Sequence, residues 1–256
     1  MDQVDQPTIV VRGEVPEGMI AYGREKLLAV GAHAPRRVLA AELRLDHHPD
    51  PARPRPNHVE MTLDLNGVAV RAQRSAETMS EAIDRAAARL RRRIETAGER
   101  PRARSRRSRD QHSWHHEDLP TERPNFYPRP VAERRLVRQK TFAMQPESIE
   151  EALFDLERLD HVFFLFVHDD TGAEAVVYRV GDGYGLRQRV ATPEAVKRVE
   201  IPLDLGPNPA TVTIDDALAV LNASDAPFEF FVDESSGRGM VAYRRYDGHY
   251  GLSLPA

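Results

Sequence analysis

Arginine residues at helical spacing are the side chains in this chain best suited to binding a ligand. Arg85, Arg89 and Arg92 follow one another at intervals of four and three residues, so a helix would carry them on one ridge. No acidic residue stands four positions from Arg89 or Arg92. Because a guanidinium makes paired hydrogen bonds with phosphate oxygens, the ridge predicts binding to the backbone and shape of a nucleic acid. The alternative interpretation is a solvated charged face.

The distribution of charge along the chain favours a polyanionic partner. The net charge is only −4, but residues 85–109 hold eleven Arg and two acidic residues, whereas residues 143–182 hold ten acidic residues and two Arg. Arg71, Arg74 and Arg93 add to the basic end of the first domain. A basic half and an acidic half predict a polyanion bound on one side only.

Residues 1–99 are predicted to form one α+β domain that positions these arginines. Apolar and polar residues alternate over 59–65, as is typical of a half-buried strand, and Asn66-Gly67 is a strong hairpin signal. Thr78 with Glu81 three residues later is a capping-box pattern. The expected order is β-α-β-β-β-α, with strands at 8–13, 37–48, 58–67 and 68–76 and helices at 16–30 and 78–99. The helices should cover one face of the sheet.

Residues 100–135 have the composition of a linker. They are rich in Pro, Arg and Ser, contain few aliphatic residues and show no hydrophobic period. Such a segment buries too little apolar surface to fold, which predicts a disordered, extended connection.

One sequence pattern occurs twice in the C-terminal half. SIEEAL at 148–153 matches TIDDAL at 213–218, an offset of 65, and VVYRVGDGYGL at 176–186 matches VAYRRYDGHYGL at 241–252. Each copy predicts a helix with a hydroxyl N-cap, an aromatic strand, a Gly turn, a second strand, an Asp-Gly turn and a short last strand. The repeat predicts two tandem α+β domains, at 136–198 and 199–256.

A unit of about fifty residues buries little apolar surface and is marginally stable alone. The strand FFLFV at 163–167 is apolar on both faces and therefore needs cover on each side. We expect the two copies to pair within the chain; the alternative is two domains that never touch. The residues expected to make the pairing are Phe163, Leu165, Phe166, Tyr178, Phe228, Phe230, Phe231 and Tyr243.

Several classes of function lack the residues that they need. The chain has no cysteine, and no phosphate-binding loop, nucleophile elbow or zinc-protease motif occurs. Six of its ten histidines lie in two clusters, at 47–58 and 112–116, in or near expected loops, and His168-Asp169-Asp170 has the pattern of a turn. We therefore expect no enzyme, no metal site and no cofactor. The N-terminus lacks a signal-peptide pattern and the longest apolar run is VFFLFV, which predicts a soluble cytoplasmic protein.

These residues resemble those of a known family, the ribosome hibernation promoting factors, also called ribosome-associated inhibitors. The N-terminal resemblance lies in VEMTLDLNGVAVRAQRSAETMSEAIDRAAARLRRRI, with Tyr22, Lys26 and Leu27. The C-terminal resemblance is to the tail domain of long-form members and lies in VRQKTFAMQPESIEEAL, HVFFLFVHDDTG and VVYRVGDGYGL. A β-α-β-β-β-α domain alone would be weak evidence, because double-stranded-RNA-binding domains look similar.

The resemblance implies a function and a set of residues that contact ribosomal RNA. The N-terminal domain of the family lodges in the mRNA and tRNA channel of the small ribosomal subunit, where it blocks translation and protects idle ribosomes under stress. The resemblance implies ribosomal-RNA contacts at Arg71, Arg74, Arg85, Arg89, Arg92, Arg93 and Lys26. In long forms, the tail domains of two molecules dimerise and bring two ribosomes together.

The chain departs from the family pattern because it carries two tail copies. If these copies pair internally, the dimerising surface is used up, and the protein should silence single ribosomes. The alternatives are a long-form factor that dimerises ribosomes through its tail domains, and a general RNA-binding or scaffold protein that acts off the ribosome.

Overall fold

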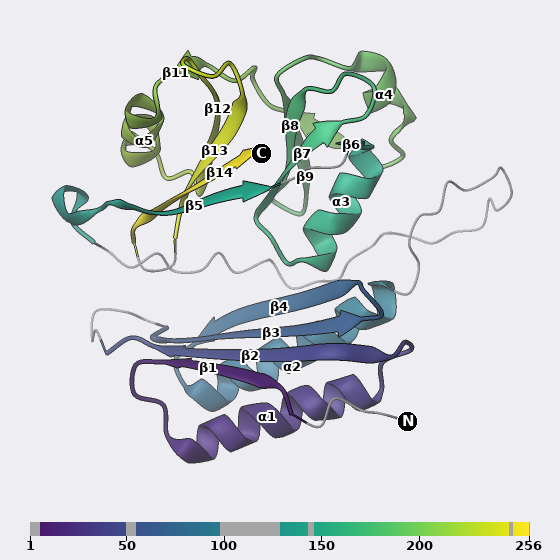
Figure 1. Cartoon of the computed structure of the whole chain (residues 1–256), viewed down its shortest axis with the longest axis vertical. Coiled ribbons are helices and arrows are strands. Elements are labelled where there is room, and N and C mark those ends of the chain that lie inside the picture. Colours follow the sequence, from purple (N-terminus) through teal and green to yellow (C-terminus); the bar gives the residue numbers. More distant parts are fainter. Residues whose placement is uncertain (1–5, 50–54, 98–128, 143–145, 246–247, 256) are drawn as a thin grey trace, which may run out of the picture. The chain divides into compact units, whose positions relative to one another are not determined.

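The structure is a computed structural model that describes residues 6–49, 55–97, 129–142, 146–245 and 248–255. The chain folds as two compact units, one built on the N-terminal residues and one on the C-terminal residues (Figure 1). Most of the predicted linker, up to position 128, lies outside the described residues. None of the helices in the described ranges has both the length and the apolar character needed to cross a membrane.

The N-terminal unit is a four-stranded sheet with two helices, in the predicted order. Its elements are β1 (Thr8–Arg12), α1 (Glu17–Ala32), β2 (Val38–His47), β3 (Asn57–Leu65), β4 (Ala69–Ala76) and α2 (Met79–Ala97). The strands lie in the order β1-β2-β3-β4, with β1 parallel to β2 and the other pairs antiparallel. This confirms the predicted α+β class.

One hydrophobic core joins the sheet to both helices. The inward side chains of β3, among them Met61 and Leu63, pack in the same cluster as Leu27 of α1 and as Ile83 and Leu90 of α2. Side chains alternate along a strand, so the polar residues between them point to the opposite face. The two helices therefore cover the same face of the sheet, as predicted.

The predicted local signals are present at the ends of these elements. Asn66 and Gly67 adopt φ values of 56° and 86°, and the Leu65 amide donates to the Val68 carbonyl at 2.8 Å, which makes a tight hairpin turn. The Glu81 amide donates to Thr78 Oγ1 at 3.3 Å, so Thr78 caps α2. Both features fix where the arginine-bearing strand β4 and helix α2 begin.

The C-terminal unit contains the predicted helix and three strands twice. The first set is α3 (Ile149–Arg158), β7 (Phe163–His168), β8 (Glu174–Val180) and β9 (Gly183–Gln188); the second is α5 (Ile214–Ala223), β12 (Phe228–Asp233), β13 (Gly239–Arg244) and β14 (Tyr250–Pro255). Shorter elements complete it: a 3-10 helix η1 (Val131–Glu133), β5 (Leu136–Phe142), β6 (Pro146–Glu147), α4 (Pro193–Arg198), β10 (Leu203–Leu205) and β11 (Thr211–Val212).

Both tail helices begin with the predicted caps. The Glu151 amide donates to Ser148 Oγ at 3.3 Å, and the Ser148 amide donates to Glu151 Oε2 at 3.0 Å, which is a reciprocal capping box. The Asp216 amide donates to Thr213 Oγ1 at 3.1 Å in the second copy. The turn between β8 and β9 differs from the prediction by one residue: Val180 pairs with Gly183, so Gly181, at φ 55°, and Asp182 form it. Glycine takes this backbone conformation without steric cost.

The two tail sheets exchange strands. Their orders are β10-β9-β8-β7-β6 and β11-β12-β13-β14-β5. Strand β5 lies in the first predicted domain, ahead of its helix, but runs parallel to β14 of the second. Strand β10 lies in the second predicted domain, ahead of its helix, but runs parallel to β9 of the first. Each sheet therefore takes an edge strand from the range that the sequence assigns to the other copy.

A tyrosine that lies over a glycine explains why both copies of the hairpin have these two residues at the same places. Tyr178 pairs across the strands with Gly185, and Tyr243 pairs with Gly251. A Cβ atom built on either glycine would lie 2.2 Å from the tyrosine ring. Glycine leaves room for the ring, whereas any residue with a Cβ atom would displace it.

Replacing Gly185 with Ala should therefore destabilise the C-terminal unit. The added methyl group must displace the Tyr178 ring, and overpacking of this kind costs about 1–3 kcal/mol. Thermal unfolding of the full chain should show the transition of this unit lowered by several degrees.

Gly183→Ala is the matched control on the same strand. Its Cβ would meet only the Val180 carbonyl oxygen, at 3.8 Å. Equal unfolding temperatures for the two variants would contradict the proposed role of the tyrosine–glycine pair.

Candidate functional site

The six arginines expected to bind RNA stand on two adjacent elements, α2 and β4. Arg85 and Arg92 are exposed on α2, on the side away from the buried stripe that contains Ile83 and Leu90. Arg89 and Arg93 follow the same helix at a spacing of four residues, but both side chains are buried, at 5% and 7% exposure. Helix α2 packs on β4, which is the edge strand of the sheet. The structure thus brings the predicted arginines to one margin of the domain.

The β4 arginines lie on opposite faces of that margin. Val70 and Ala72 of β4 are buried under the helices, and strand alternation places Arg74 on their side. Arg71 alternates to the other face, where its Nε lies 3.5 Å from Glu60 Oε1 of β3. The basic surface therefore wraps around an edge and is not one flat patch.

Arg85 and Arg71 have acidic neighbours on α2 and β3. Arg85 Nη2 lies 2.8 Å from Glu81 Oε1, one helical turn earlier, and Arg71 faces Glu60 as described. The Glu81 contact follows from the spacing of four residues on one helix. The Glu60 contact joins neighbouring strands, and no local spacing predicts it. These carboxylates compete with phosphate for the same guanidinium groups.

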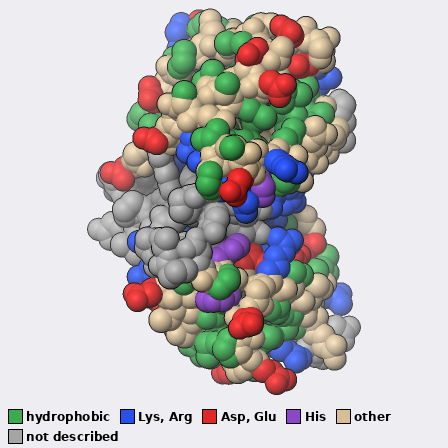
Figure 2. Space-filling model, turned by 90° about the vertical axis from the view of Figure 1, so that its left-hand side faces the viewer, with side chains coloured by type: hydrophobic (Ala, Val, Ile, Leu, Met, Phe, Trp, Pro, Cys, Tyr) green, Lys and Arg blue, Asp and Glu red, His purple; other side chains and the backbone are tan. Residues whose placement is uncertain are grey.

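Lys26, the seventh predicted contact, is bound within the domain. Its Nζ lies 2.8 Å from Asp84 Oδ1 of α2, and the Tyr22 hydroxyl donates to the same carboxylate oxygen at 2.8 Å. The hydrogen bond with Asp84 raises the pKa of Lys26, and the hydrogen bond from Lys26 lowers the pKa of Asp84. The pair joins α1 to α2. On the face that Figure 2 draws, acidic and basic side chains are interspersed with hydrophobic ones.

A second site is the face on which the two tail copies meet. One hydrophobic cluster contains Leu165 and Val176 of the first copy and Phe228, Phe230 and Val241 of the second, with Phe163, Tyr178 and Tyr243 packed against it. The Phe163 ring centroid lies 4.9 Å from that of Phe228 and 5.5 Å from that of Tyr243, and Tyr178 lies 5.4 Å from Phe228. Aromatic pairs at such distances attract one another beyond their burial.

Phe166 and Phe231, which were also expected on this face, point away from it. Phe166 lies in the cluster with Leu153 and Leu156 of α3, and Phe231 lies in the cluster with Leu221 of α5. The reason is strand alternation, which sends successive side chains to opposite faces. These two residues attach each helix to its own sheet.

Two ion pairs across this face were not anticipated. The Glu174 side chain is only 1% exposed, and its carboxylate lies 2.5 Å from Arg238 of the second copy and 2.7 Å from Arg189 of the first. Arg187 of the first copy lies 2.9 Å from Glu229 of the second. Burial tends to raise the pKa of Glu174, but the hydrogen bond from Arg238, backbone hydrogen bonds and the charge of Arg189 together outweigh it, and the pKa is lowered. A comparison of the copies at the offset of 65 could have drawn attention to Glu174, because its counterpart is Gly239.

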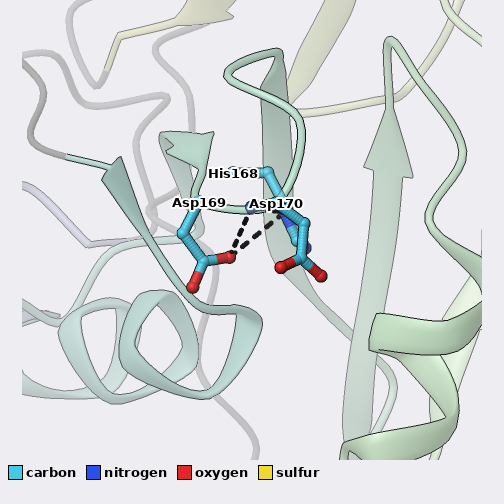
Figure 3. Close-up of side chains that lie close together, drawn as sticks. All are labelled: His168, Asp169 and Asp170. Carbon is cyan, nitrogen blue, oxygen red and sulfur yellow. Dashed lines mark hydrogen bonds and ion pairs between the residues drawn. The ribbon is translucent and has the colours of Figure 1, made fainter.

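His168, Asp169 and Asp170 form a turn, as predicted (Figure 3). The Asp170 amide donates to His168 Nδ1 at 3.1 Å and to Asp169 Oδ1 at 2.9 Å, while Asp170 Oδ2 lies 2.5 Å from Arg198. Each of the three side chains thus has a structural contact in the turn. At the same place in the second copy, Asp233 accepts hydrogen bonds from Ser235 and Ser236.

The family models match both parts of the chain. Residues 9–102 match the model of the sigma 54 modulation protein / S30EA ribosomal protein. The model of the C terminus of this family matches residues 131–186 and residues 208–252, one range in each tail copy. The duplication predicted from the repeat is thereby confirmed.

Proteins of known name are similar to the chain along much of its length. A ribosome hibernation promotion factor of Deinococcus radiodurans is 30% identical over 190 residues, which cover 68% of this chain and 92% of that protein. A dormancy associated translation inhibitor of Mycobacterium tuberculosis is 34% identical over 135 residues; the match covers 48% of this chain and spans about half, 49%, of that protein's length. The N-terminal domain of Thermus thermophilus Protein Y is 22% identical with a TM-score of 0.30, covering 38% of this chain and 98% of that structure.

The two family models together match most of the chain outside residues 103–130, and the Deinococcus protein is covered almost completely. This chain therefore belongs to the sigma 54 modulation / S30EA ribosomal protein family, and the C-terminal domain of this family is present in it twice.

Proposed function

We propose that the N-terminal domain lodges in the decoding channel of the small ribosomal subunit, where it blocks mRNA and tRNA binding and stabilises idle ribosomes in the cytoplasm under stress. The observation that carries the proposal is the gathering of Arg71, Arg74 and the α2 arginines along one margin of the domain. The names of the related proteins, a ribosome hibernation promotion factor and a translation inhibitor, support it. The proposed role is binding, and it requires no catalytic group.

The wrapped shape of the basic margin suits folded RNA. Arg74 and Arg71 leave β4 on opposite faces of the sheet, so together with α2 they can reach phosphates on two sides of an inserted edge. Such contacts read the shape and the backbone of RNA rather than a base sequence. A structured groove in ribosomal RNA supplies phosphates on both walls, which a single unfolded strand does not.

We also propose that the two tail copies pair within one chain and so leave ribosomes single. Phe163, Tyr178 and Leu165 have their apolar partners on the second copy, and the exchanged strands β5 and β10 tie each sheet to the other copy's range. A short connection between the copies gives each a high effective concentration of the other, so that an internal partner outcompetes a partner on another molecule.

Replacing Arg85, Arg89 and Arg92 together with Ala should weaken binding of the full chain to isolated small subunits. Each lost phosphate contact reduces the slope of log affinity against log salt by about 0.7–0.9, so the slope should fall by about 2–3. Binding is measured by co-sedimentation across a salt series. The charge-matched control replaces Arg24, Arg36 and Arg37, which lie outside α2 and β4. An unchanged slope in the α2 variant, or an equal loss in the control, would count against this surface.

Replacing Asp84 with Asn should strengthen binding at low salt. The change releases Lys26 from its carboxylate partner and adds a phosphate-binding cation to the same domain. Glu25→Gln, beside Lys26 on α1, makes the same change in net charge and should have a smaller effect. If both variants bind equally well, the release of Lys26 is not what matters.

Ribosomes mixed with the purified full chain should sediment as single particles. Internal pairing leaves the contact face of the tail copies occupied, so no second ribosome is recruited. The measurement is a sucrose-gradient profile with saturating protein. A paired-ribosome peak would refute the internal pairing and support a factor that dimerises ribosomes.

A further inference from the structure

We infer that the contact face of the tail copies is selective: it accepts the first copy against the second and rejects either copy against its own kind. This inference rests on the proposed pairing of the copies and specifies which partner the face takes. The partner is a complementary copy, from the same chain or, by reciprocal exchange, from another.

Most apolar positions of the face carry the same residue in both copies; the exception is Leu165, which corresponds to Phe230. At the offset of 65, Phe163 corresponds to Phe228, Val176 to Val241, and Tyr178 to Tyr243. These side chains all belong to the shared cluster. A largely shared apolar surface attracts either copy, so the choice of partner rests chiefly on the polar side chains around it.

Glu174 excludes a pair of first copies. It is 1% exposed and its counterpart is Gly239, on which a Cβ atom would lie 2.7 Å from the Glu174 Cβ. In a pair of two first copies, a glutamate would stand where Gly239 stands, and two buried carboxylates would collide. Arg238, which neutralises Glu174 at 2.5 Å, would also be missing, because its counterpart is Ala173. Buried like charges without counter-ions are strongly unfavourable.

A pair of second copies loses the ion pairs as well. Arg238 would meet no carboxylate at the position of Glu174, because that position is Gly239 in the second copy. Glu229 would face Ser253 in place of Arg187, since the register that aligns Val176 with Arg187 aligns Val241 with Ser253. Each of the two cross-copy ion pairs thus exists only in the mixed combination.

Charge reversal turns this selectivity into a measurable exchange between chains. A chain with Glu174→Arg places two arginines at the face, and a chain with Arg238→Glu places two glutamates there. In an equimolar mixture, the first copy of each chain becomes complementary to the second copy of the other. Light scattering of the full chains, without ribosomes, should give 28.9 kDa for the wild type and for each variant alone. The mixture should give a complex of twice that mass.

The double variant Glu174→Arg with Arg238→Glu restores the pair within one chain and should remain a single chain in any mixture. Because Glu174 is buried, Arg187→Glu and Glu229→Arg serve as a second reversal set at the better exposed pair. Self-association of any single variant, or mixtures of both sets that remain single chains, would overturn the inference. Small-subunit binding by the same variants is measured separately. If the chains still form the complementary complex but none of them binds small subunits, the ribosomal role is contradicted and the selectivity of the contact face is not.

Discussion

The need to cover both faces of a small sheet is the constraint on which the C-terminal unit depends. Strands β7 and β12 carry large apolar side chains on each face, and one helix of ten residues covers only one of them. The other face is covered by the second sheet, through the cluster around Phe230 and Val176. On the proposed internal pairing, duplication within the chain supplies that cover without a second molecule, and the exchanged strands β5 and β10 extend each sheet with the other copy's leading segment.

The N-terminal unit meets the same need in a different way. Two helices cover one face of its sheet, and the other face carries charged residues such as Glu60 and Arg71. Outside its buried apolar stripe, α2 exposes Arg85 and Arg92 at the margin with β4. The acidic partners Glu81 and Asp84 hold Arg85 and Lys26 in place, and they also set how much attraction to phosphate these two side chains retain.

Local patterns in the sequence predicted the elements well because local physics fixes them. The caps at Thr78 and Ser148 and the turn at Asn66-Gly67 depend on neighbouring residues, and each lies where it is expected, whereas the turn between β8 and β9 lies one residue earlier. The position of the arginines on α2 and β4 followed from the same periodicities. The family was also recognisable, because its motifs cover both units.

Contacts between distant residues escaped prediction. The partner of β5 lies more than a hundred positions away on β14, and no local pattern encodes such a pairing. Phe166 and Phe231 were chosen for the pairing face by residue type, whereas strand alternation sends them to the helices. The Glu174–Arg238 pair forms at two positions where the copies differ, because Glu174 corresponds to Gly239 and Arg238 to Ala173. A search for similarities between the copies therefore passes over it.

The central claim is that each tail copy finds its cover inside the same chain. Because the chain contains no cysteine, a pair introduced at Thr141 of β5 and Leu254 of β14, which are register neighbours, would report on this directly. Mild oxidation of the dilute full chain, followed by denaturing electrophoresis without reductant, distinguishes the outcomes. The account predicts a cross-link within single chains that persists on dilution. Covalent dimers as the main product, or no cross-link, would contradict it.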